Sequence, residues 1–502
     1  MSRNVRLKKI RRIMDGGRPR VLDLFAGCGG LSLGFHRAGF DIIGALEIDP
    51  LAAASHRLNF HRPFEDVEPE ALAKDITKIE PNELVGEFEG KSTVDDSVDV
   101  IVGGPPCQAF ARVGRAKLRE VQDHPSAFKQ DPRGNLYLRY LAYVKRLQPV
   151  AILMENVPDV INYGGHNIPE ETGEVLKEMG YVCRYTLLNS VFYGVPQMRE
   201  RMFLVAVANE LSTDVRFPQP THWFDLPKGY EGSRQVALKH VNGNGNGQLS
   251  FLPRDSDYYV DPPKATADLP RAVTAKQALH DLPPITAHLT GALRRGARHL
   301  DEFVSYLPVE PSAYAAMMRT WRGFEGNGGV YDHTIRSLSD RDFEIFKRMK
   351  PGNQYPEAHQ IALEVLEERL DELDDQGLRP KGGTAAFRDL MQKTVPPYDP
   401  CKFPNKWRKI AADEPARTLM AHLGKDSYSH IHYDSRQART ISVREAARLM
   451  SFPDGFRFVG TMNPAFRQIG NAVPPLMAAA LADVIMSTLT GVQCREESLS
   501  NV

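Results

Sequence analysis

The sequence has few cysteines, and they form no pattern. The five cysteines among the 502 residues are Cys28, Cys107, Cys183, Cys401 and Cys494, and none is spaced from another as C-x-x-C. This distribution excludes a zinc site visible in the sequence and argues against a disulfide framework. We therefore predict no metal site, and a reducing compartment, the cytoplasm, as the location of the protein.

The sequence also lacks an excess of charge and a long hydrophobic run. Its 63 Lys and Arg residues balance its 63 Asp and Glu residues, so any nucleic-acid binding must come from local basic patches. Residues 1–20 are basic without the apolar core of a signal peptide, and the apolar stretch 475–492 contains Asp483. We expect an amphipathic helix there and no membrane segment. The length predicts about two or three domains.

The first two hundred residues alternate between short apolar runs and helical segments. Residues 21–25, 42–46, 98–102 and 151–154 are expected to be strands, and the segment 31–38 a helix. This alternation is typical of a parallel sheet that helices cover on both faces. Polar residues follow the strand ends, where open α/β sheets bind ligands.

The middle of the chain, about 208–430, has a different sequence pattern. Residues 242–247 read NGNGNG, which predicts a loop. Residues 361–375 are expected to form a helix with leucines on one face and acids on the other, serving as scaffold rather than DNA contact. Near the end, Ser442 and Glu445 have the spacing of a capping box, and Pro475 suits the first turn of a helix over 476–489.

A glycine-rich turn follows the first expected strand. Gly27, Gly29 and Gly30 would let the backbone approach a ligand at a helix N-terminus, and Glu47, about 20 residues later, could hold ribose hydroxyls. The spacing suits dinucleotide and S-adenosyl cofactors alike. A tight turn without a ligand is the structural alternative.

Cys107 follows another expected strand, in the rigid sequence Gly103-Gly104-Pro105-Pro106. A lone cysteine is commonly a small buried hydrophobe. Here, however, the following loop carries Arg112, Arg115, Lys117 and Arg119, which could lower the pKa of the thiol and bind phosphates. Spacing alone leaves open whether Cys107 is a nucleophile or a core residue.

Two further segments carry charge at strand ends. Glu155 follows four apolar residues, and burial would raise its pKa and suit it to donate a proton. Strand alternation would point Gln197, Arg199 and Arg201 to one face, which suits carbonyl-rich or anionic ligands. The alternatives are a surface acid and a solvated strand edge.

Taken together, these segments resemble the cytosine-5 DNA methyltransferase family, and they occur in the family's order. The matching segments are 23–30 (DLFAGCGG), 47–49 (EID), 74–76 (KDI), 104–108 (GPPCQ), 131–136 (DPRGNL), 155–157 (ENV), 193–201 (YGVPQMRER), 444–449 (REAARL) with 452–454 (FPD), and 468–475 (QIGNAVPP). The resemblance covers about 20–207 and 406–490. It implies a Rossmann-like α/β methyltransferase sheet with an inserted, smaller target-recognition domain.

The resemblance implies a mechanism. The target cytosine would be flipped out of duplex DNA, because its C5 cannot be reached in the stack. Cys107 would attack C6, Glu155 would hold the exocyclic amine and N3 and supply a proton, and Arg199 would bind the cytosine carbonyl. Arg201 would support this pocket. The methyl group would come from S-adenosylmethionine.

The resemblance also implies the cofactor pocket. Phe25 would pack on the adenine, Glu47 would bind the ribose hydroxyls, and Asp75 would accept from the adenine amine. The walls would come from Ile48, Ile76, Pro106 and Leu136, and the methionine end would lie at Gly27, Gly29, Gly30, Asn471 and Ala472.

The implied DNA contacts come from two parts of the chain. Gln108, Arg112 and Arg115 follow the nucleophile, and Lys406, Arg408 and Thr418 lie in the smaller domain. The sequence departs from the family at Ala109-Phe110-Ala111, where a phosphate-binding hydroxyl is missing. For Trp407, ordinary core packing is an equal alternative.

The expected domains are 1–217 and 464–502 for catalysis and 218–463 for target recognition. The expected partners are double-stranded DNA and, in a restriction-modification or phage-defence setting, cognate restriction or defence proteins; we expect a monomer. The alternatives are a tRNA cytosine methyltransferase, which the long recognition region disfavours, and a catalytically silent DNA-binding regulator, which intact Cys107 and Glu155 disfavour. A nicotinamide dehydrogenase would leave PPCQ and ENV unexplained.

Overall fold

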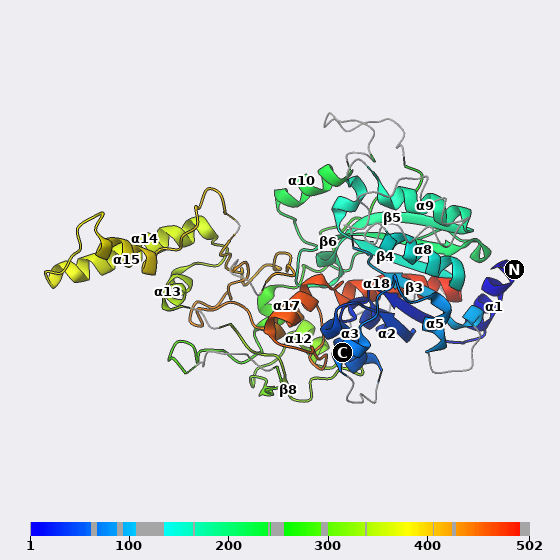
Figure 1. Cartoon of the computed structure of the whole chain (residues 1–502), viewed down its shortest axis with the longest axis horizontal. Helices are drawn as coiled ribbons and strands as arrows, with labels where there is room; N and C mark the ends of the chain where they lie inside the picture. The colour runs from blue at the N-terminus through cyan, green and yellow to red at the C-terminus, as the bar shows by residue number, and fades with distance from the viewer. Residues whose placement is uncertain are drawn as a thin grey trace. The chain divides into compact units, whose positions relative to one another are not determined.

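A computed structural model describes residues 2–61, 68–87, 94–106, 135–163, 166–238, 241, 256–292, 300–336, 339–404, 406–423 and 428–491. The chain forms two compact units (Figure 1). The sheet unit comprises Met1–Ala272 and Ala472–Val502, and the insert unit comprises Val273–Asn471.

The sheet unit is built on a six-stranded sheet in the order β2-β1-β3-β4-β6-β5. Its strands are β1 (Arg20–Leu24), β2 (Asp41–Leu46), β3 (Val100–Gly103), β4 (Ala151–Asn156), β5 (Tyr181–Asn189) and β6 (Glu200–Ala208). Strands β2, β1, β3 and β4 run parallel, and β6 runs antiparallel to both β4 and β5. The predicted strands are confirmed, but the sheet is mixed rather than parallel, because β6 runs antiparallel to β4 and the unpredicted β5 pairs with β6.

Helices cover both faces of the sheet, as predicted. Alternate strand residues such as Leu22 and Ile152 join one core with α8 (Asn135–Leu147) and α9 (Ile168–Glu178). Their neighbours Val21 and Ala151 join the opposite core with α1 (Ser2–Met14), α2 (Gly30–Arg37) and α18 (Pro475–Thr490). The smaller elements are α3 (Pro50–Phe60), α4 (Pro69–Leu72), α5 (Pro81–Gly86), α6 (Val94–Ser97), η3 (Pro158–Asn162), η4 (Ser190–Tyr193) and η5 (Asn209–Leu211).

Helix α18 returns from the end of the chain to pack on α2. A Cβ atom on Gly34 would lie 2.4 Å from the Cβ of Ala478, so the two helices touch through backbone and small side chains. The predicted helix over 476–489 is confirmed, with Pro475 in its first turn. By composition, Met462–Thr490 is apolar enough to cross a membrane, but more than half of its most apolar window is buried and residues 472–474 interrupt the helix.

The segment after β6 belongs to the sheet unit, beyond the expected boundary at residue 217. Trp223 pairs its backbone with Pro270 and Ala272, and Tyr259 pairs beside Tyr185 of β5. This segment contains α10 (Lys228–Ala237). The units therefore change over at Ala272 and again at Asn471 rather than at 217 and 463.

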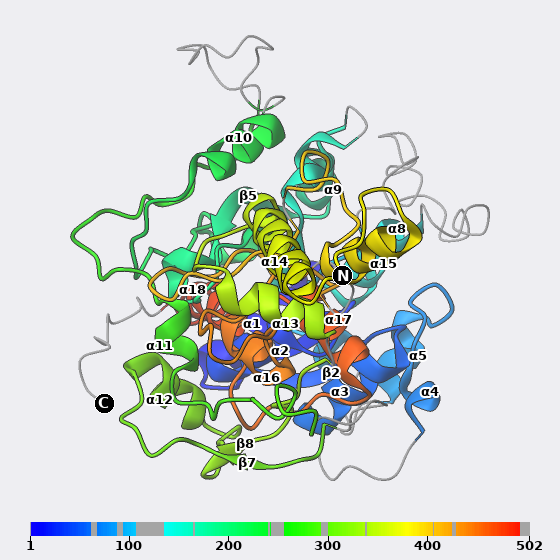
Figure 2. The ribbon, with the colours of Figure 1, turned by 90° about the vertical axis from the view of Figure 1, so that its left-hand side faces the viewer.

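The insert unit consists mainly of short helices and loops. Its elements are α11 (Ala275–Leu279), β7 (Val304–Ser305), α12 (Ala313–Arg319), β8 (Gly329–Val330), α13 (Asp340–Arg348), α14 (Tyr355–Asp375), α15 (Ala385–Thr394), α16 (Val443–Leu449) and α17 (Met462–Asn471). Figures 1 and 2 show α14 and α15 side by side, and Arg369 donates to the Thr394 hydroxyl between them at 3.0 Å.

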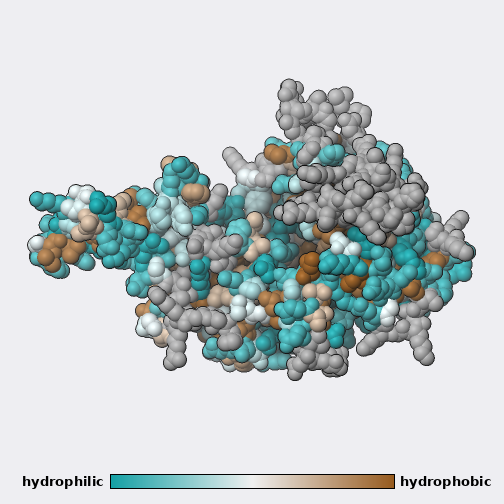
Figure 3. Space-filling view, viewed as in Figure 1, coloured by the Kyte–Doolittle hydropathy of each residue, from teal (hydrophilic) through white to brown (hydrophobic). Residues whose placement is uncertain are grey.

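Helix α14 begins earlier than the expected residue 361 because Gln354 and Glu357 form a capping box. Its buried residues include Tyr355 and Leu366, which share a core with Trp407, so the core interpretation of Trp407 is confirmed. The acids on the outer face are exposed, as predicted. On the face shown in Figure 3, hydrophobic residues are scattered among hydrophilic ones.

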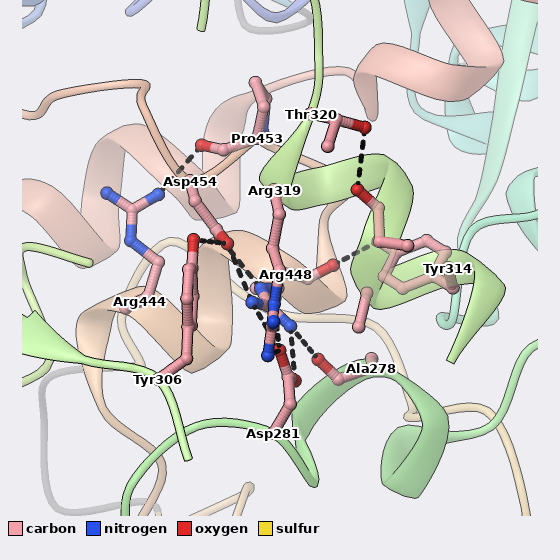
Figure 4. Close-up of polar contacts among 12 residues, drawn as sticks. Ala278, Asp281, Tyr306, Tyr314, Arg319, Thr320, Arg444, Arg448, Pro453 and Asp454 are labelled. Atoms are coloured by element: carbon pink, nitrogen blue, oxygen red, sulfur yellow. Dashed lines mark hydrogen bonds and ion pairs between the residues drawn. The ribbon is translucent and has the colours of Figure 1, made fainter. Parts of the chain in front are cut away.

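Three arginines around α16 are fully buried and each is paired with a carboxylate. Figure 4 shows Arg448 between Asp281 and Asp454, with nitrogen–oxygen distances of 2.7 Å to each. Arg444 pairs with Asp332, and Arg439 pairs with Glu445. The predicted capping box of Ser442 and Glu445 is present at the start of the helix. Buried charges of this kind are tolerated because every one has a hydrogen-bonded partner.

Candidate active site

The parallel strands end at one edge of the sheet and bring the predicted residues together there. Leu24 lies beside both Leu46 and Gly103, and Gly103 lies beside Met154. The residues that follow these positions are therefore neighbours at the carboxyl edge of the sheet, as ligand-binding α/β sheets require. They include Phe25, Glu47 and Glu155.

Glu47 ties the glycine turn to the end of β2. Its Oε2 accepts a hydrogen bond from Gly27 N at 2.8 Å, and its Oε1 accepts one from Asp49 N at 2.8 Å. Burial raises the pKa of Glu47, against the lowering effect of these hydrogen bonds. The carboxylate thus stays fixed in orientation, while each oxygen keeps a second lone pair for a hydroxyl group.

The glycines of the turn serve different purposes. A Cβ on Gly29 would lie 2.5 Å from the Phe60 ring, and a Cβ on Gly30 would lie 2.3 Å from Val473 O, so protein packing requires both glycines. A Cβ on Gly27 would meet nothing within 4 Å. Gly27 therefore borders open space that a ligand can occupy. Ala472 lies against the turn, close to Gly30, whereas the exposed Asn471 ends α17.

Asp75 and Ile76 lie beside Glu47 because Lys74 N donates to Glu47 O at 2.7 Å. The Asp75 carboxylate accepts from Thr77, and although burial opposes it, this bonding lowers the pKa of Asp75. Ile76 is buried, and Phe25 and Leu136 pack against the same core. The Ile48 side chain is 64% exposed, unlike its neighbours.

Glu155 forms the centre of a second group of charged residues. Its Oε1 lies 3.1 Å from Arg201 Nε, and burial raises the pKa of its carboxyl group, while Arg201 and Arg199 act in the opposite direction. A Cβ on Gly104 would lie 2.8 Å from Glu155 Oε2, so a larger residue there would displace the carboxylate. Glu155 is therefore not a surface acid.

Arg199 and Gln197 are buried, which excludes the alternative of a solvated edge. Burial lowers the pKa of Arg199 well below its usual range. Its backbone is fixed from both sides: Asn189 Oδ1 accepts from Arg199 N at 3.1 Å, and Ser190 N donates to Arg199 O at 2.9 Å. Arg199 and Arg201 both lower the pKa of Glu155. Gln197 and Arg199 precede β6, which begins at Glu200, so the expected strand alternation does not extend over all three residues.

The expected nucleophile Cys107 lies outside the described residues, as do Gln108, Arg112, Arg115, Lys117 and Arg119. The turn that precedes them is anchored, because Asn156 Nδ2 donates to Pro105 O at 2.7 Å. Pro106 is exposed. Among the described residues, no group of His, Cys, Asp and Glu could hold a metal ion.

The expected DNA contacts of the insert unit have partners within that unit. Lys406 Nζ lies 3.4 Å from the centroid of the Tyr398 ring, and Arg408 Nη2 donates to Gln354 Oε1 at 2.9 Å. Thr418 is half-buried. Lys406 and Arg408 are therefore restrained side chains rather than freely extended ones.

Sequence reasoning missed a buried network below the glycine turn. Ser32 Oγ donates to Asp23 Oδ2 at 2.7 Å and lies 2.9 Å from His56 Nε2. Burial raises the pKa of Asp23 to about 7, although Ser32 lowers it. The only signal of this network in the sequence is Asp23 itself, an acid inside an otherwise apolar part of β1. The network joins β1, α2 and α3 around the turn.

Comparison with known proteins agrees with this geometry. The sequence profile of C-5 cytosine-specific DNA methylases matches residues 19–273 and 321–487. An inferred type II methyltransferase of Oceanobacillus iheyensis is 36% identical over 479 residues, covering 94% of this chain and 96% of that protein. A type II methyltransferase of Thalassovita gelatinovora is 29% identical, covering 93% of this chain and 99% of that protein.

Among solved structures, an inferred DNA modification methyltransferase encoded within an E. coli prophage has the same fold. The TM-score is 0.58 at 22% sequence identity, covering 94% of this chain and 99% of the other. The extent of the family match and the identity to the Oceanobacillus protein show that this chain belongs to the C-5 cytosine-specific DNA methylase family.

Proposed function

We propose that the enzyme transfers a methyl group from S-adenosylmethionine to C5 of a cytosine that is flipped out of a specific duplex DNA sequence. The observation that carries this proposal is the group formed by Glu155, Arg199 and Arg201. It combines a carboxyl group of raised pKa with the buried guanidinium of Arg199 and the half-buried guanidinium of Arg201 at the carboxyl edge of the sheet. Such a group can donate to a ring nitrogen and bind a carbonyl oxygen of the same base.

The residues around the glycine turn fit S-adenosylmethionine. Gly27 borders open space, Glu47 offers lone pairs for two ribose hydroxyls, and Asp75 is a carboxylate acceptor for an amine. The exposed Ile48 side chain supplies an apolar surface for a purine ring. When bound, S-adenosylmethionine supplies an electrophilic methyl group.

The chain's own residues would then act on the cytosine. The Cys107 thiolate adds to C6 while Glu155 gives a proton to N3 and holds the exocyclic amine. Arg199 binds the carbonyl oxygen and Arg201 keeps Glu155 in place. After methylation of C5, a base takes the C5 proton, and the C6–sulfur bond breaks to release Cys107.

Recognition of DNA is proposed to be shared between the two units. Gln108, Arg112 and Arg115 would contact DNA near the nucleophile, and Lys406, Arg408 and Thr418 would do so from the insert unit. We place the expected target-recognition domain in the insert unit. The names of the relatives favour self-marking in a type II restriction-modification system, with a cognate restriction or defence protein as partner.

Methyl transfer from a tritiated donor to duplex DNA and to tRNA tests this proposal. We expect incorporation into DNA only, at one sequence that bisulfite sequencing of expressing cells identifies. Incorporation into tRNA alone would support the alternative RNA substrate, and incorporation into neither would support a silent regulator.

Covalent trapping tests the nucleophile separately. DNA carrying 5-fluorocytosine at the target should form a stable adduct with the wild-type enzyme, because no C5 proton can leave. The Cys107→Ser variant should form no adduct and transfer no methyl group, while still binding S-adenosylmethionine. Turnover by the serine variant would remove Cys107 from the mechanism.

A further inference from the structure

Helix α10 packs directly on the segment that carries Arg199 and Arg201. The Tyr230 hydroxyl donates to Met198 O at 2.9 Å. Arg234 Nη2 donates to Leu187 O at 3.0 Å and lies 3.2 Å from Glu200 Oε2. The contacts with Met198 and Glu200 fall on the residues on either side of Arg199.

The backbone of this segment is held at each successive residue. Ser190 Oγ donates to Gln197 O at 2.8 Å, and Ser190 N donates to Arg199 O at 2.9 Å. Between these two, Met198 O accepts from Tyr230. One of three consecutive carbonyl groups is therefore held by α10 rather than by the turn that follows β5.

Glu200 depends on α10 for its charge. Its side chain is 8% exposed, and burial raises the pKa of its carboxyl group while Arg234 lowers it. A buried carboxylate without a partner is costly, so loss of Arg234 would force Glu200 to move or to take up a proton. Movement of Glu200 would displace the start of β6, which lies between Arg199 and Arg201.

Apolar contacts fix α10 in this place. Met198 forms a small core with Val191 and Ala272, against which Tyr230, Phe224 and Leu226 pack. The helix also packs on η3, the turn that follows Glu155. Burial lowers the pKa of Arg201, and Tyr230 lies near enough to act in the opposite direction. The helix therefore contacts the turn that follows Glu155 and also Glu200, the first residue of β6.

We propose that Tyr230 and Arg234 are positioning residues for the cytosine pocket, acting through Met198 and Glu200 on Arg199 and Arg201. The inference rests on the proposed function of that pocket. A misplacement of about 1 Å can lower a rate by about 100-fold, so small losses at these anchors are measurable.

Tyr230→Phe removes one hydroxyl and tests the first anchor. We expect kcat to decrease by about 10-fold to 100-fold, because the lost hydrogen bond allows Arg199 and Arg201 to shift. Affinity for S-adenosylmethionine should stay unchanged. Tyr181→Phe is the matched control: it removes a Tyr-to-carbonyl hydrogen bond of 2.8 Å to Pro149 in the same unit. It should leave kcat unchanged.

Arg234→Met tests the second anchor, and Arg234→Lys tests rescue by a charge. We expect a loss of kcat for Met and a partial recovery for Lys. The control is Arg184→Met, which breaks the 3.3 Å pair with Asp214 on the outside of β5. A decrease in kcat as large in the control as in Arg234→Met would assign the effect to general destabilisation and overturn the inference.

Amide hydrogen exchange provides a readout that needs no activity. Exchange at Met198, Arg199 and Arg201 should accelerate in Tyr230→Phe and Arg234→Met but not in the controls. Unchanged exchange, or faster exchange with unchanged kcat, would overturn the positioning roles. An inactive wild-type enzyme would instead overturn the proposed function, and this inference with it.

Discussion

Glu155 is a carboxyl group whose burial favours the protonated form, although two guanidiniums oppose that preference. Glu155→Gln keeps the hydrogen bonds but cannot give a proton to N3. We expect kcat to fall by roughly 10²–10⁴, with little change in DNA affinity. Turnover of the wild-type enzyme should decline as pH rises through the raised pKa of Glu155, and this alkaline decline should be absent in the variant.

Single-turnover rates measured across pH distinguish this role from a structural one. Glu171→Gln is a matched control, because Glu171 on α9 is also buried and its Oε1 lies 2.9 Å from His166 Nδ1. It should lower stability without changing the pH profile. A glutamine variant at position 155 with wild-type turnover would leave Glu155 as a structural acid.

Asp23 makes stability depend on pH. Its pKa is about 7 in the folded protein and 3.8 for a free side chain, so the folded state holds the proton more tightly. The resulting stabilisation is full below pH 4, is lost as pH rises, and is gone above pH 7. Because Asn cannot ionise, Asp23→Asn should gain stability over the wild-type protein between pH 5 and pH 7, on the order of 3 kcal/mol.

Urea unfolding at several pH values tests this expectation. Asp214→Asn, at an exposed carboxylate on the surface of the same unit, is the control and should show no such trend. A constant stability difference between Asp23→Asn and the wild-type protein from pH 5 to pH 8 would contradict the raised pKa.

Residues of the site differ in how far the sequence could predict them. Glu47 and Glu155 were predictable because each follows an apolar strand whose end is fixed by local pattern. The ion pair of Glu155 with Arg201 was not, because it requires the antiparallel pairing of β4 with β6. Tyr230 and Arg234 gave no signal, since their partners are distant in the sequence and include two backbone carbonyls.

At the scale of elements, α2 and α18 pack so closely that a methyl group would not fit between them. Gly34→Ala would place a Cβ 2.5 Å from Ala479 N, which forces the helices apart. We expect a loss of about 1–3 kcal/mol and weaker binding of S-adenosylmethionine, because α2 carries the glycine turn. Gly86→Ala at the end of α5 meets nothing within 4 Å and is the control.

Thermal unfolding and cofactor titration measure both effects. Gly86→Ala should be neutral or slightly stabilising, since Ala favours helix over Gly. Equal stability of the two alanine variants would show that the helices tolerate separation.

Elements with a strong local signal were predicted, and the others depend on distant partners. The capping box at Ser442 and the proline at 475 mark helix starts by local chemistry. Strand β5 lacks such a mark: its polar residues Arg184 and Thr186 interrupt the apolar run, and its pairing with β6 stabilises it. The unit boundary beyond residue 217 likewise depends on the pairing of Trp223 with Pro270.

At the scale of the whole molecule, a chain of zero net charge must bind DNA through local basic groups. Arg112 and Arg115 are our candidates for binding phosphates. Replacing both with alanine should weaken binding about equally on all sequences and flatten the salt dependence by up to about one log-log unit for each arginine that binds a phosphate. The methylated sequence should not change, because phosphate contacts carry no sequence information.

Affinity measured against salt concentration tests the double variant. Lys8→Ala, at an exposed lysine on α1, is the control for removal of surface charge. A wild-type salt slope in the double variant, or a shifted methylation sequence, would reject the phosphate role of these arginines.

The packing of α18 on α2 also determines when, during synthesis, the core of the sheet unit can form. More than four hundred residues separate the end of α2 at Arg37 from the start of α18 at Pro475. At ribosomal speeds of about 5–20 residues per second, α18 is synthesised about 20–90 seconds after α2. During this time the apolar face of α2 lacks its contacts with α18. The core around the glycine turn can therefore be completed only after the whole insert unit, Val273–Asn471, has been synthesised.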